Sequence, residues 1–293
     1  DIGIVSSLLH KDFLNKSVAF LNYVLPGITD DGPSDLESGH GTHVAGSIVG
    51  TGVLSGANLS SNNFSESYSG TAPKADLYFQ AMEILCDSLP ICGGAYNKFV
   101  LITPTDLNDM FQSAYNYGAR IQSNSWGDST NLGDYTQQSV DVDTFMWNNK
   151  DYTILFAAGN NGTYGAGSIL PPGTSKNTIT VGASVGDSSI ASFSSRGPTD
   201  DLRIKPDVVA PGSNIISTRS HVATGILWGH VSVDYENSGG TSMATPLTAG
   251  IVTLVREYLN KNKNITNPSS ALIKAMIINA VSYTHLTLPT KRI

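Results

Sequence analysis

The sequence has few charged residues, no long apolar run and only two cysteines, and each shortage excludes a class of protein. Charged residues are 14% of the 293 residues, the net charge is −7 and no basic stripe occurs, so we expect neither nucleic acid nor an anionic membrane as a partner. No run reaches the roughly 18 apolar residues of a membrane-spanning helix. The 40% hydrophobic content and the 29 glycines are typical of a compact, turn-rich globular protein.

The two cysteines, Cys86 and Cys92, flank a short segment that contains a proline. We predict a local disulfide between them; two unpaired thiols are the alternative. Five Asn-X-Ser/Thr sequons are present, at Asn15, Asn58, Asn63, Asn161 and Asn264. Together with the cysteine pair, these sequons favour a glycoprotein that is secreted or passes through the secretory pathway.

Strand-like and helix-like segments alternate along the chain, and no linker separates two halves. This order predicts an α/β fold, with a mainly parallel twisted sheet and helices on both faces. Strands are expected at residues 75–82, 121–125, 152–158, 178–183 and 206–210. The helix after Ser242 is predicted to bury a stripe of Leu247, Gly250, Ile251, Leu254, Val255 and Tyr258. Residues 55–69, which are rich in Ser and Asn, are expected to form an exposed, mobile loop.

The segment Ser-Gly-Gly-Thr-Ser-Met-Ala-Thr-Pro at residues 238–246 places Ser242 where a glycine-rich turn enters an apolar helix. The first backbone N–H groups of a helix have no intrahelical partner, and glycines allow a substrate to approach closely. A serine in this position can therefore act as a nucleophile beside half of an oxyanion hole. An N-cap serine is the alternative for the motif in isolation.

Two upstream motifs supply a base and an acid. His40 opens His-Gly-Thr-His, and Asp1 opens Asp-Ile-Gly-Ile. We predict that His40 is the general base, with His43 as a competing candidate, and that Asp1 orients the imidazole. The other histidines, His10, His221, His230 and His285, match no motif and are expected on the surface or in loops.

The order Asp, His, Ser and these three motifs resemble the subtilase family of serine peptidases, from Asp1 to about Ala280. The resemblance implies a subtilisin-like three-layer architecture and a serine-type endopeptidase that works through an acyl-enzyme. It also implies a catalytic domain at residues 1–280. Residues 281–293 look like a non-native tail. In the family pattern the first histidine of His-Gly-Thr-His is catalytic and the second is structural.

By the same resemblance, Asn160 supplies the second oxyanion donor, beside the Ser242 backbone N–H. A turn asparagine is the alternative for Asn160. Because a glycan on Asn161 would crowd the cleft, we expect that sequon to be unmodified. Substrate would bind by strand addition, as an extended peptide that pairs with the backbone of Ser125, Trp126 and Gly127. Ala158 and Gly159 would line the primary pocket, and Trp126 would border an outer apolar pocket, unless it is a core residue.

The family implies no cofactor for the chemistry, although structural calcium is possible without an assignable ligand. It also implies an N-terminal pro-segment absent from this sequence. Since the sequence opens on Asp1, we expect an N-terminally truncated domain that lacks the strand anchoring this residue. Two rivals remain. An α/β-hydrolase esterase would need G-x-S-x-G, whereas this motif ends in Ala244, and its histidine should follow the serine. A non-catalytic binding module would not need the complete set of catalytic residues.

Overall fold

The computed structural model describes residues 10–14, 16, 18–22, 38–87, 96–186 and 189–280. Its largest sheet has the strand order β5 (Ile121–Asn124), β6 (Thr153–Ala157) and β7 (Ile179–Val185), with β9 (Val208–Pro211) also paired to β7. These four strands are parallel, and β8 (Ser189–Ile190) is antiparallel to β7. A separate parallel pair consists of β1 (Val18–Asn22) and β2 (Leu77–Ala81). The predicted mainly parallel sheet is therefore confirmed.

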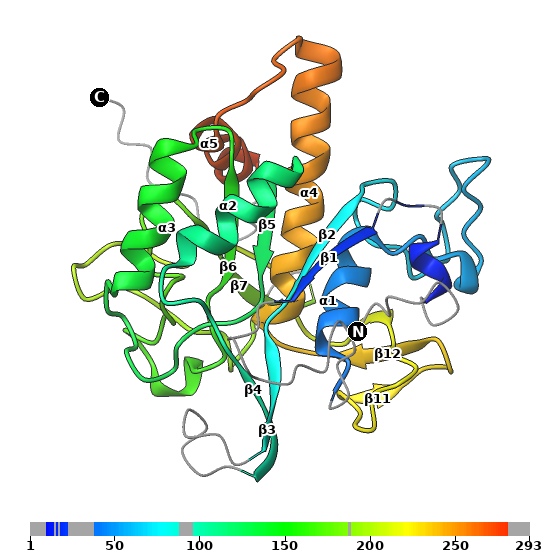
Figure 1. The fold of residues 1–293 in the computed structure, drawn as a ribbon, viewed down its shortest axis with the longest axis horizontal. Coiled ribbons are helices and arrows are strands. Elements are labelled where there is room, and N and C mark those ends of the chain that lie inside the picture. The colour runs from blue at the N-terminus through cyan, green and yellow to red at the C-terminus, as the bar shows by residue number, and fades with distance from the viewer. Residues whose placement is uncertain are drawn as a thin grey trace.

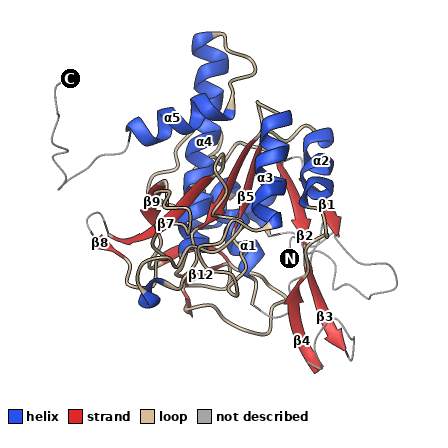
Figure 2. Cartoon of the chain, turned by 90° about the vertical axis from the view of Figure 1, so that its left-hand side faces the viewer, coloured by secondary structure: helices blue, strands red, loops and turns tan. Residues whose placement is uncertain are grey.

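Helices cover both faces of the largest sheet (Figures 1 and 2). The helices α4 (Thr241–Lys263) and α5 (Ser270–Ala280) share one apolar cluster with Leu155 of β6. On the other face, α2 (Leu107–Tyr117) and α3 (Gln137–Asn148) pack with Ile154 and Phe156. Alternate side chains of one strand thus enter two cores, as expected of a parallel sheet covered on both sides. The three-layer α/β architecture is confirmed.

The smaller elements surround this frame. The hairpin of β3 (Glu83–Asp87) and β4 (Tyr96–Leu101) projects away from it (Figure 1). An antiparallel sheet has the order β10 (Ile215–Thr218), β12 (Tyr235–Ser238) and β11 (Gly229–His230). Helix α1 (His40–Val49) packs against α4, and short 3-10 turns occupy Lys11–Phe13, Val53–Ser55 and Gly162–Tyr164. Residues 55–69 are mostly exposed, as predicted.

The ends of α2 follow from local sequence. Asp106 precedes the helix, and its side chain accepts the backbone N–H of Asn108 at 2.9 Å. Gly118 ends the helix with a φ of 111°, a left-handed conformation that glycine adopts without steric cost. Both signals are local, with a capping side chain before the helix and a glycine after it.

The predicted buried stripe of α4 is wrong in part. Ile251, Leu254 and Tyr258 are each 45–46% exposed. Gly250 is buried as predicted. The buried positions of α4 are mostly small or polar, namely Thr241, Met243, Ala244, Thr245, Pro246, Thr248, Ala249, Gly250, Val252 and Leu259. Small side chains allow the helix to lie close to its neighbours: a Cβ atom on Gly250 would collide with the Thr71 side chain. Apolar periodicity therefore indicated a helix but not its packed face.

Residues 205–212 include a buried charged group, Lys205. Lys205 Nζ donates to Asp207 Oδ2 at 2.6 Å and to Thr180 Oγ1 at 2.8 Å. Burial lowers the pKa of Lys205 to about 8, against the opposing effect of Asp207. This ion pair ties the segment to β7, in agreement with a structural role.

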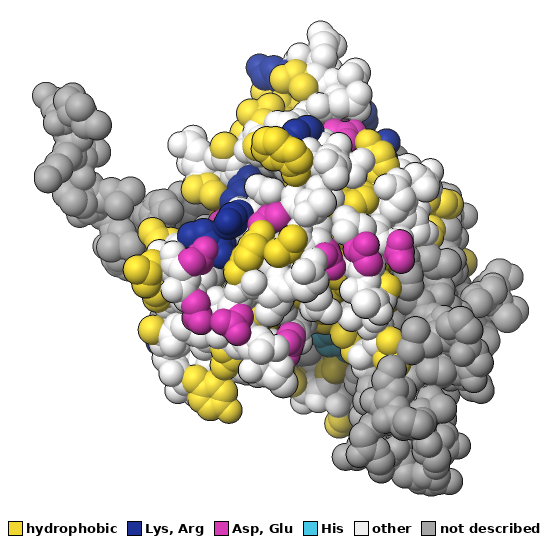
Figure 3. All heavy atoms as spheres, turned by 60° about the vertical axis from the view of Figure 1, so that its left-hand side comes forward, with side chains coloured by type: hydrophobic (Ala, Val, Ile, Leu, Met, Phe, Trp, Pro, Cys, Tyr) yellow, Lys and Arg dark blue, Asp and Glu magenta, His cyan; other side chains and the backbone are white. Residues whose placement is uncertain are grey.

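On the face drawn in Figure 3, basic side chains lie in small groups and form no stripe, and several acidic side chains lie apart from them. Arg203 and Asp201 form an ion pair, with 2.8 Å between Nε and Oδ2. Among the helices in the described ranges, none is both long enough and apolar enough to cross a bilayer.

Candidate active site

The turn before α4 leaves a backbone donor available at Ser242. Gly240 has φ 145° and ψ 165°, a conformation open essentially to glycine, and its N–H donates to Gly212 O at 2.7 Å. Ser242 is the second residue of the helix, so its N–H has no intrahelical acceptor. The glycine conformation thus starts the helix where this N–H and the Ser242 hydroxyl share one half-buried position.

Ser125 and Ser242 hold each other through reciprocal hydrogen bonds. Ser125 Oγ donates to the Ser242 carbonyl at 2.8 Å, and Ser242 Oγ donates to the Ser125 carbonyl at 3.3 Å. Pro246 explains the first bond. It is the sixth residue of α4, beyond the first turn of the helix. Because proline has no N–H, the Ser242 carbonyl lacks its helical donor, and Ser125 takes that place.

Asn160 lies against the same turn, and its side-chain carbonyl oxygen is bonded to Thr241. Asn160 Oδ1 accepts the Thr241 N–H at 2.9 Å and the Thr241 hydroxyl at 3.1 Å. The Thr241 oxygen in turn accepts the Gly159 N–H at 3.1 Å. Since Oδ1 is engaged, the amide nitrogen Nδ2 faces the other way, beside Gly240.

Thr241 is a positioning residue that the sequence reasoning missed. Its hydroxyl and N–H both orient Asn160, and it immediately precedes the serine. The available signal was a threonine at the start of a helix, where hydroxyl groups commonly bond to nearby backbone. That signal could not name Asn160 as the partner, because the two residues are 81 positions apart.

His40 and His43 occupy different environments on α1. His40 is the first residue of the helix, is half-buried, and lines a cavity together with Ser125 and Trp126. His43 is fully buried, and its Nε2 lies 3.0 Å from Ile215 O. Burial lowers the pKa of His43 to about 4, so this imidazole is neutral at physiological pH. The geometry therefore favours His40 as the accessible base and gives His43 a structural position.

The predicted substrate residues follow two paired strands. Because β5 and β6 are parallel and Asn124 lies opposite Phe156, the segment of Ser125, Trp126 and Gly127 and the segment of Ala158 and Gly159 leave the sheet at the same edge. Ala158 and Gly159 are buried, whereas the other three residues are half-buried.

Trp126 lies between a core and a cavity. Its ring packs edge-on against Phe156, with 5.1 Å between centroids, at the margin of the α2–α3 core. The same residue also lines the cavity that contains His40.

This cavity separates β2 from β5 and has a volume of about 670 Å³. Residues 77–82 and 121–126 line it along the full length of both strands, with α1 and α4 also contributing. The described contact between the two strands is through side chains, where Gln122 Nε2 donates to Gln80 Oε1 at 3.2 Å. Every residue of β2 is only half-buried, while every residue of β6 is buried.

Comparison with known proteins decides the family. The sequence profile described as the subtilase family matches residues 3–291. The chain belongs to the subtilase family. Serine protease AprX of Bacillus subtilis (strain 168) is 33% identical over 276 residues, which cover 88% of this subtilase and 55% of AprX. Subtilisin Savinase of Lederbergia lenta is 30% identical over 230 residues, 78% of this chain and 66% of that protein.

Other relatives are much longer than this subtilase. The serine protease/ABC transporter B family protein tagD of Dictyostelium discoideum is 29% identical over 87% of this chain, which is 18% of tagD. The chain thus spans under a fifth of tagD and about half of AprX. Among solved structures, the patellamide maturation protease PatA has a TM-score of 0.63 at 22% identity, covering 96% of this chain and 85% of that chain. That likeness confirms the fold.

Two of the predicted features of this subtilase lie outside the described residues. Asp1 belongs to the undescribed residues 1–9, and Cys92 belongs to residues 88–95. The role of Asp1 and the pairing of Cys86 with Cys92 therefore stay predictions.

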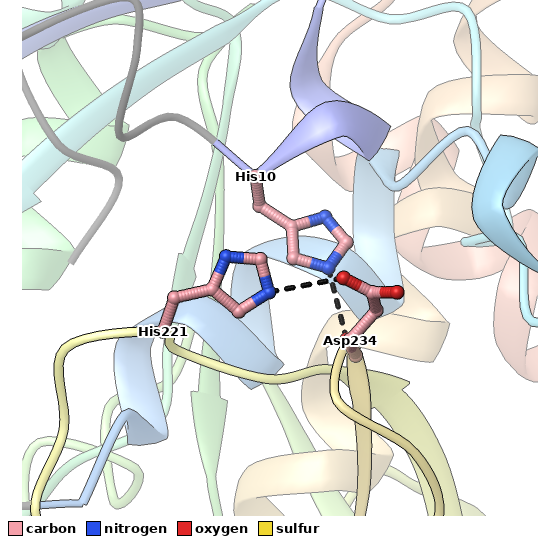
Figure 4. A group of neighbouring side chains, drawn as sticks. All are labelled: His10, His221 and Asp234. Atoms are coloured by element: carbon pink, nitrogen blue, oxygen red, sulfur yellow. Dashed lines mark hydrogen bonds and ion pairs between the residues drawn. The ribbon is translucent and has the colours of Figure 1, made fainter.

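One group of described residues could approach a metal ion: His10, His221 and Asp234 (Figure 4). His10 Nδ1 accepts the N–H of Asp12 at 3.2 Å, so Nε2 carries the proton and donates to the Asp234 carbonyl at 2.9 Å. No His10 lone pair remains for a metal. Calcium also prefers six to eight oxygen ligands, so this group does not fit the calcium that the family implies.

His10 lies outside regular secondary structure, which was one of the two expected locations, but it is not on the surface. His10 is 4% exposed and His221 is exposed, as is His230. His10 is buried because its ring packs between Phe13, Tyr235 and His221, with centroids 5.2–5.9 Å apart. His285 lies outside the described residues.

The buried, neutral His43 predicts acid sensitivity. Its folded pKa is about 4, below the ordinary value of 6.5, so between these values the unfolded chain binds a proton that the folded chain does not. Stability should therefore fall as the pH drops below 6.5, by about 3 kcal/mol in all at about pH 4. Urea unfolding of wild type and His43→Gln across this range measures the effect.

The readout is the pH slope, since the substitution itself also changes packing. His43→Gln should flatten the slope of the free energy of unfolding below pH 6.5. His230→Gln, which removes an exposed imidazole, controls for loss of a histidine. Equal slopes for His43→Gln and wild type would contradict the prediction.

Proposed function

We propose that this subtilase is a serine-type endopeptidase that cleaves peptide bonds through an acyl-enzyme, with Ser242 as nucleophile, His40 as general base and Asp1 as orienting carboxylate. One observation carries the proposal: the Ser242 hydroxyl, its backbone N–H and the Asn160 amide meet at one helix start. A nucleophile beside two preorganised donors is the arrangement that acyl transfer needs.

In the proposed reaction the Ser242 hydroxyl turns from the Ser125 carbonyl toward His40 as substrate binds. Ser242 Oγ attacks the scissile carbonyl carbon while His40 takes its proton. The resulting oxyanion accepts hydrogen bonds from the Ser242 N–H and from Asn160 Nδ2. His40 then protonates the leaving amine as the C–N bond breaks. Water, deprotonated by His40, hydrolyses the ester and restores the serine.

Substrate would enter as an extended strand beside Ser125, Trp126 and Gly127. Backbone pairing gives affinity that does not depend on sequence, and pockets between the strands give selectivity. Ala158 and Gly159 lie at the neighbouring strand end and would line the primary pocket. Trp126, which is half-buried and packs edge-on against Phe156, would border an outer apolar pocket.

The cavity between β2 and β5 suggests how Asp1 would be held beside His40. We propose that the cavity accepts a parallel strand of about five residues, apolar on both faces, that leads directly into Asp1. Such a strand would end beside Ser125, and hence next to Ser242.

The activity is tested with an active-site-directed phosphonate on the full-length protein. We expect Ser242 to be the modified residue, identified by peptide mass, and Ser242→Ala to remain unlabelled. Comparison of peptide with short-ester turnover then separates a peptidase from an esterase. A protein that hydrolyses short esters but no peptide would contradict the endopeptidase proposal, and a protein that is not labelled would support a binding module.

We also propose a secretory route, supported by the cysteine pair and the sequons. Asn58, Asn63 and Asn264 lie in described surface segments. A mass difference between reduced and non-reduced protein tests the disulfide. The pro-segment, structural calcium and the domain boundary at residue 280 remain proposals of the same kind.

A further inference from the structure

We propose that the Trp228 indole is a specificity-determining residue, forming the wall against which an apolar side chain on the leaving-group side of the scissile bond binds. The inference rests on the proposed acyl transfer at Ser242 and names a preference for that site. The preference is for the side chain of the substrate residue that directly follows the cleaved bond.

Trp228 lies over the backbone that leads to the nucleophile. Its backbone N–H donates to Asn237 O at 2.9 Å, which extends the β11–β12 pairing by one residue. A Cβ atom on Gly239 would lie only 1.9 Å from ring atom Cη2. The six-membered ring therefore rests directly on Gly239, three residues before Ser242. Glycine is needed at this position because of that close approach.

The segment that carries Trp228 also touches the residue before the general base. A Cβ atom on Gly39 would lie 2.7 Å from the Ser220 side chain and 3.6 Å from that of Ala223. Residues 220–228 thus run from Gly39, which precedes His40, to Gly239, which lies three residues before Ser242. They form one side of the site, while Asn160 and Gly159 contact the nucleophile turn through Thr241.

The reaction chemistry places the leaving group on the side of the site formed by residues 220–228. The general base must return its proton to the departing amine, so the leaving nitrogen departs next to the imidazole. The Asn160 amide and the predicted primary pocket belong to the acyl part. A side chain attached one residue beyond the leaving nitrogen is therefore placed near the segment that adjoins His40, within reach of Trp228.

The exposure of Trp228 indicates a binding surface. The residue is 52% exposed although its ring contacts Gly239, and Ile226, Val231 and Val233 nearby in the chain are 43–72% exposed. Half-exposed tryptophans beside a reaction centre are the side chains that most often supply binding energy, since they bury a large apolar area with few rotatable bonds. An apolar or aromatic substrate residue fits this surface.

Acyl transfer isolates the leaving-group side from the rest of the site. The acyl-enzyme ester at Ser242 can be attacked by water or by the amine of an amino acid amide. In the second case the C–N bond forms, the C–O bond to Ser242 breaks, and the amine proton returns to the serine through His40. The added amide occupies the site that the leaving group vacated, so its selection reports on that site alone.

The experiment uses the full-length protein and one ester as acyl donor, with leucine amide and glycine amide as competing acceptors. We expect wild type to prefer leucine amide by about 10- to 100-fold. Trp228→Ala should reduce this ratio to nearly one, and Trp228→Phe should retain most of it. Trp147→Ala, which removes another tryptophan that is 69% exposed on α3, should leave the ratio unchanged.

The outcomes separate this inference from the proposed catalysis. A leucine preference that survives in Trp228→Ala would overturn the assignment while leaving the proposed catalysis intact. The assignment fails in the same way if Trp147→Ala lowers the ratio as much as Trp228→Ala. A wild-type protein that forms no acyl-enzyme from the ester would instead overturn the proposed function, and this inference with it.

Discussion

Replacing Ser242 by alanine is expected to lower kcat for peptide hydrolysis by about 10⁶-fold, the scale on which loss of a serine nucleophile acts. The physical reason is that no other described hydroxyl group at the start of α4 could replace that of Ser242 as nucleophile. The Thr241 hydroxyl is bonded to Asn160, and the Ser125 hydroxyl is bonded to the Ser242 carbonyl. Steady-state rates on a peptide substrate, with active-site titration, give the measurement.

The same loss is expected for His40→Ala, and the double variant should be little worse than either single one, because nucleophile and base act as a unit. Ser61→Ala, in the exposed loop, is the matched control. Asn160→Ala should be milder, at about 10²- to 10³-fold, since it removes one of two oxyanion donors. If Ser242→Ala loses less than about 10³-fold in peptide turnover, its loss matches that of a single oxyanion donor and Ser242 is not the nucleophile.

A strand joined ahead of Asp1 is expected to raise phosphonate labelling of residues 1–293 by about 10⁴-fold, the scale on which an orienting carboxylate contributes. The added segment would be about five residues of valine and isoleucine. It should pair with the facing edges of β2 and β5 and hold Asp1 beside His40. Labelling rate and thermal unfolding temperature are measured together, because filling the cavity should also stabilise the fold.

The control carries the same extension with two valines changed to proline, which removes backbone donors and breaks strand pairing. This version should gain neither labelling nor stability. If both extensions give the same labelling rate and unfolding temperature, the cavity does not bind a strand. If the valine version is stabilised without faster labelling, the strand binds but Asp1 is not the orienting group.

Features of the fold that depend on neighbours along the chain were predictable from the sequence, whereas features that depend on distant residues were not. The ends of α2 were predictable because Asp106 and Gly118 act within one turn of the helix. The buried face of α4 was not predictable. Small residues such as Ala249 and Gly250 allow one face of the helix to lie close to its neighbours, and the pattern of apolar residues does not indicate which face that is. The burial of His10 depends on Tyr235 and His221, which lie more than 200 residues away.

The catalytic candidates show the same division. Ser242, His40 and Asn160 were identified because each lies in a short motif whose residues share one turn of backbone. Thr241 as the residue that orients Asn160, and Ser125 as the donor that replaces the helical bond lost at Pro246, were invisible because each pairs residues from different strands and helices.

The order of segments, the glycine turn and the family membership were determined by the sequence itself, since backbone conformation and helix capping depend on neighbours along the chain. Only the tertiary structure decided which histidine of α1 is buried, where the Asn160 amide points and that Trp228 rests on Gly239. Those facts depend on packing and hydrogen bonds between residues far apart in the chain, which no local pattern encodes.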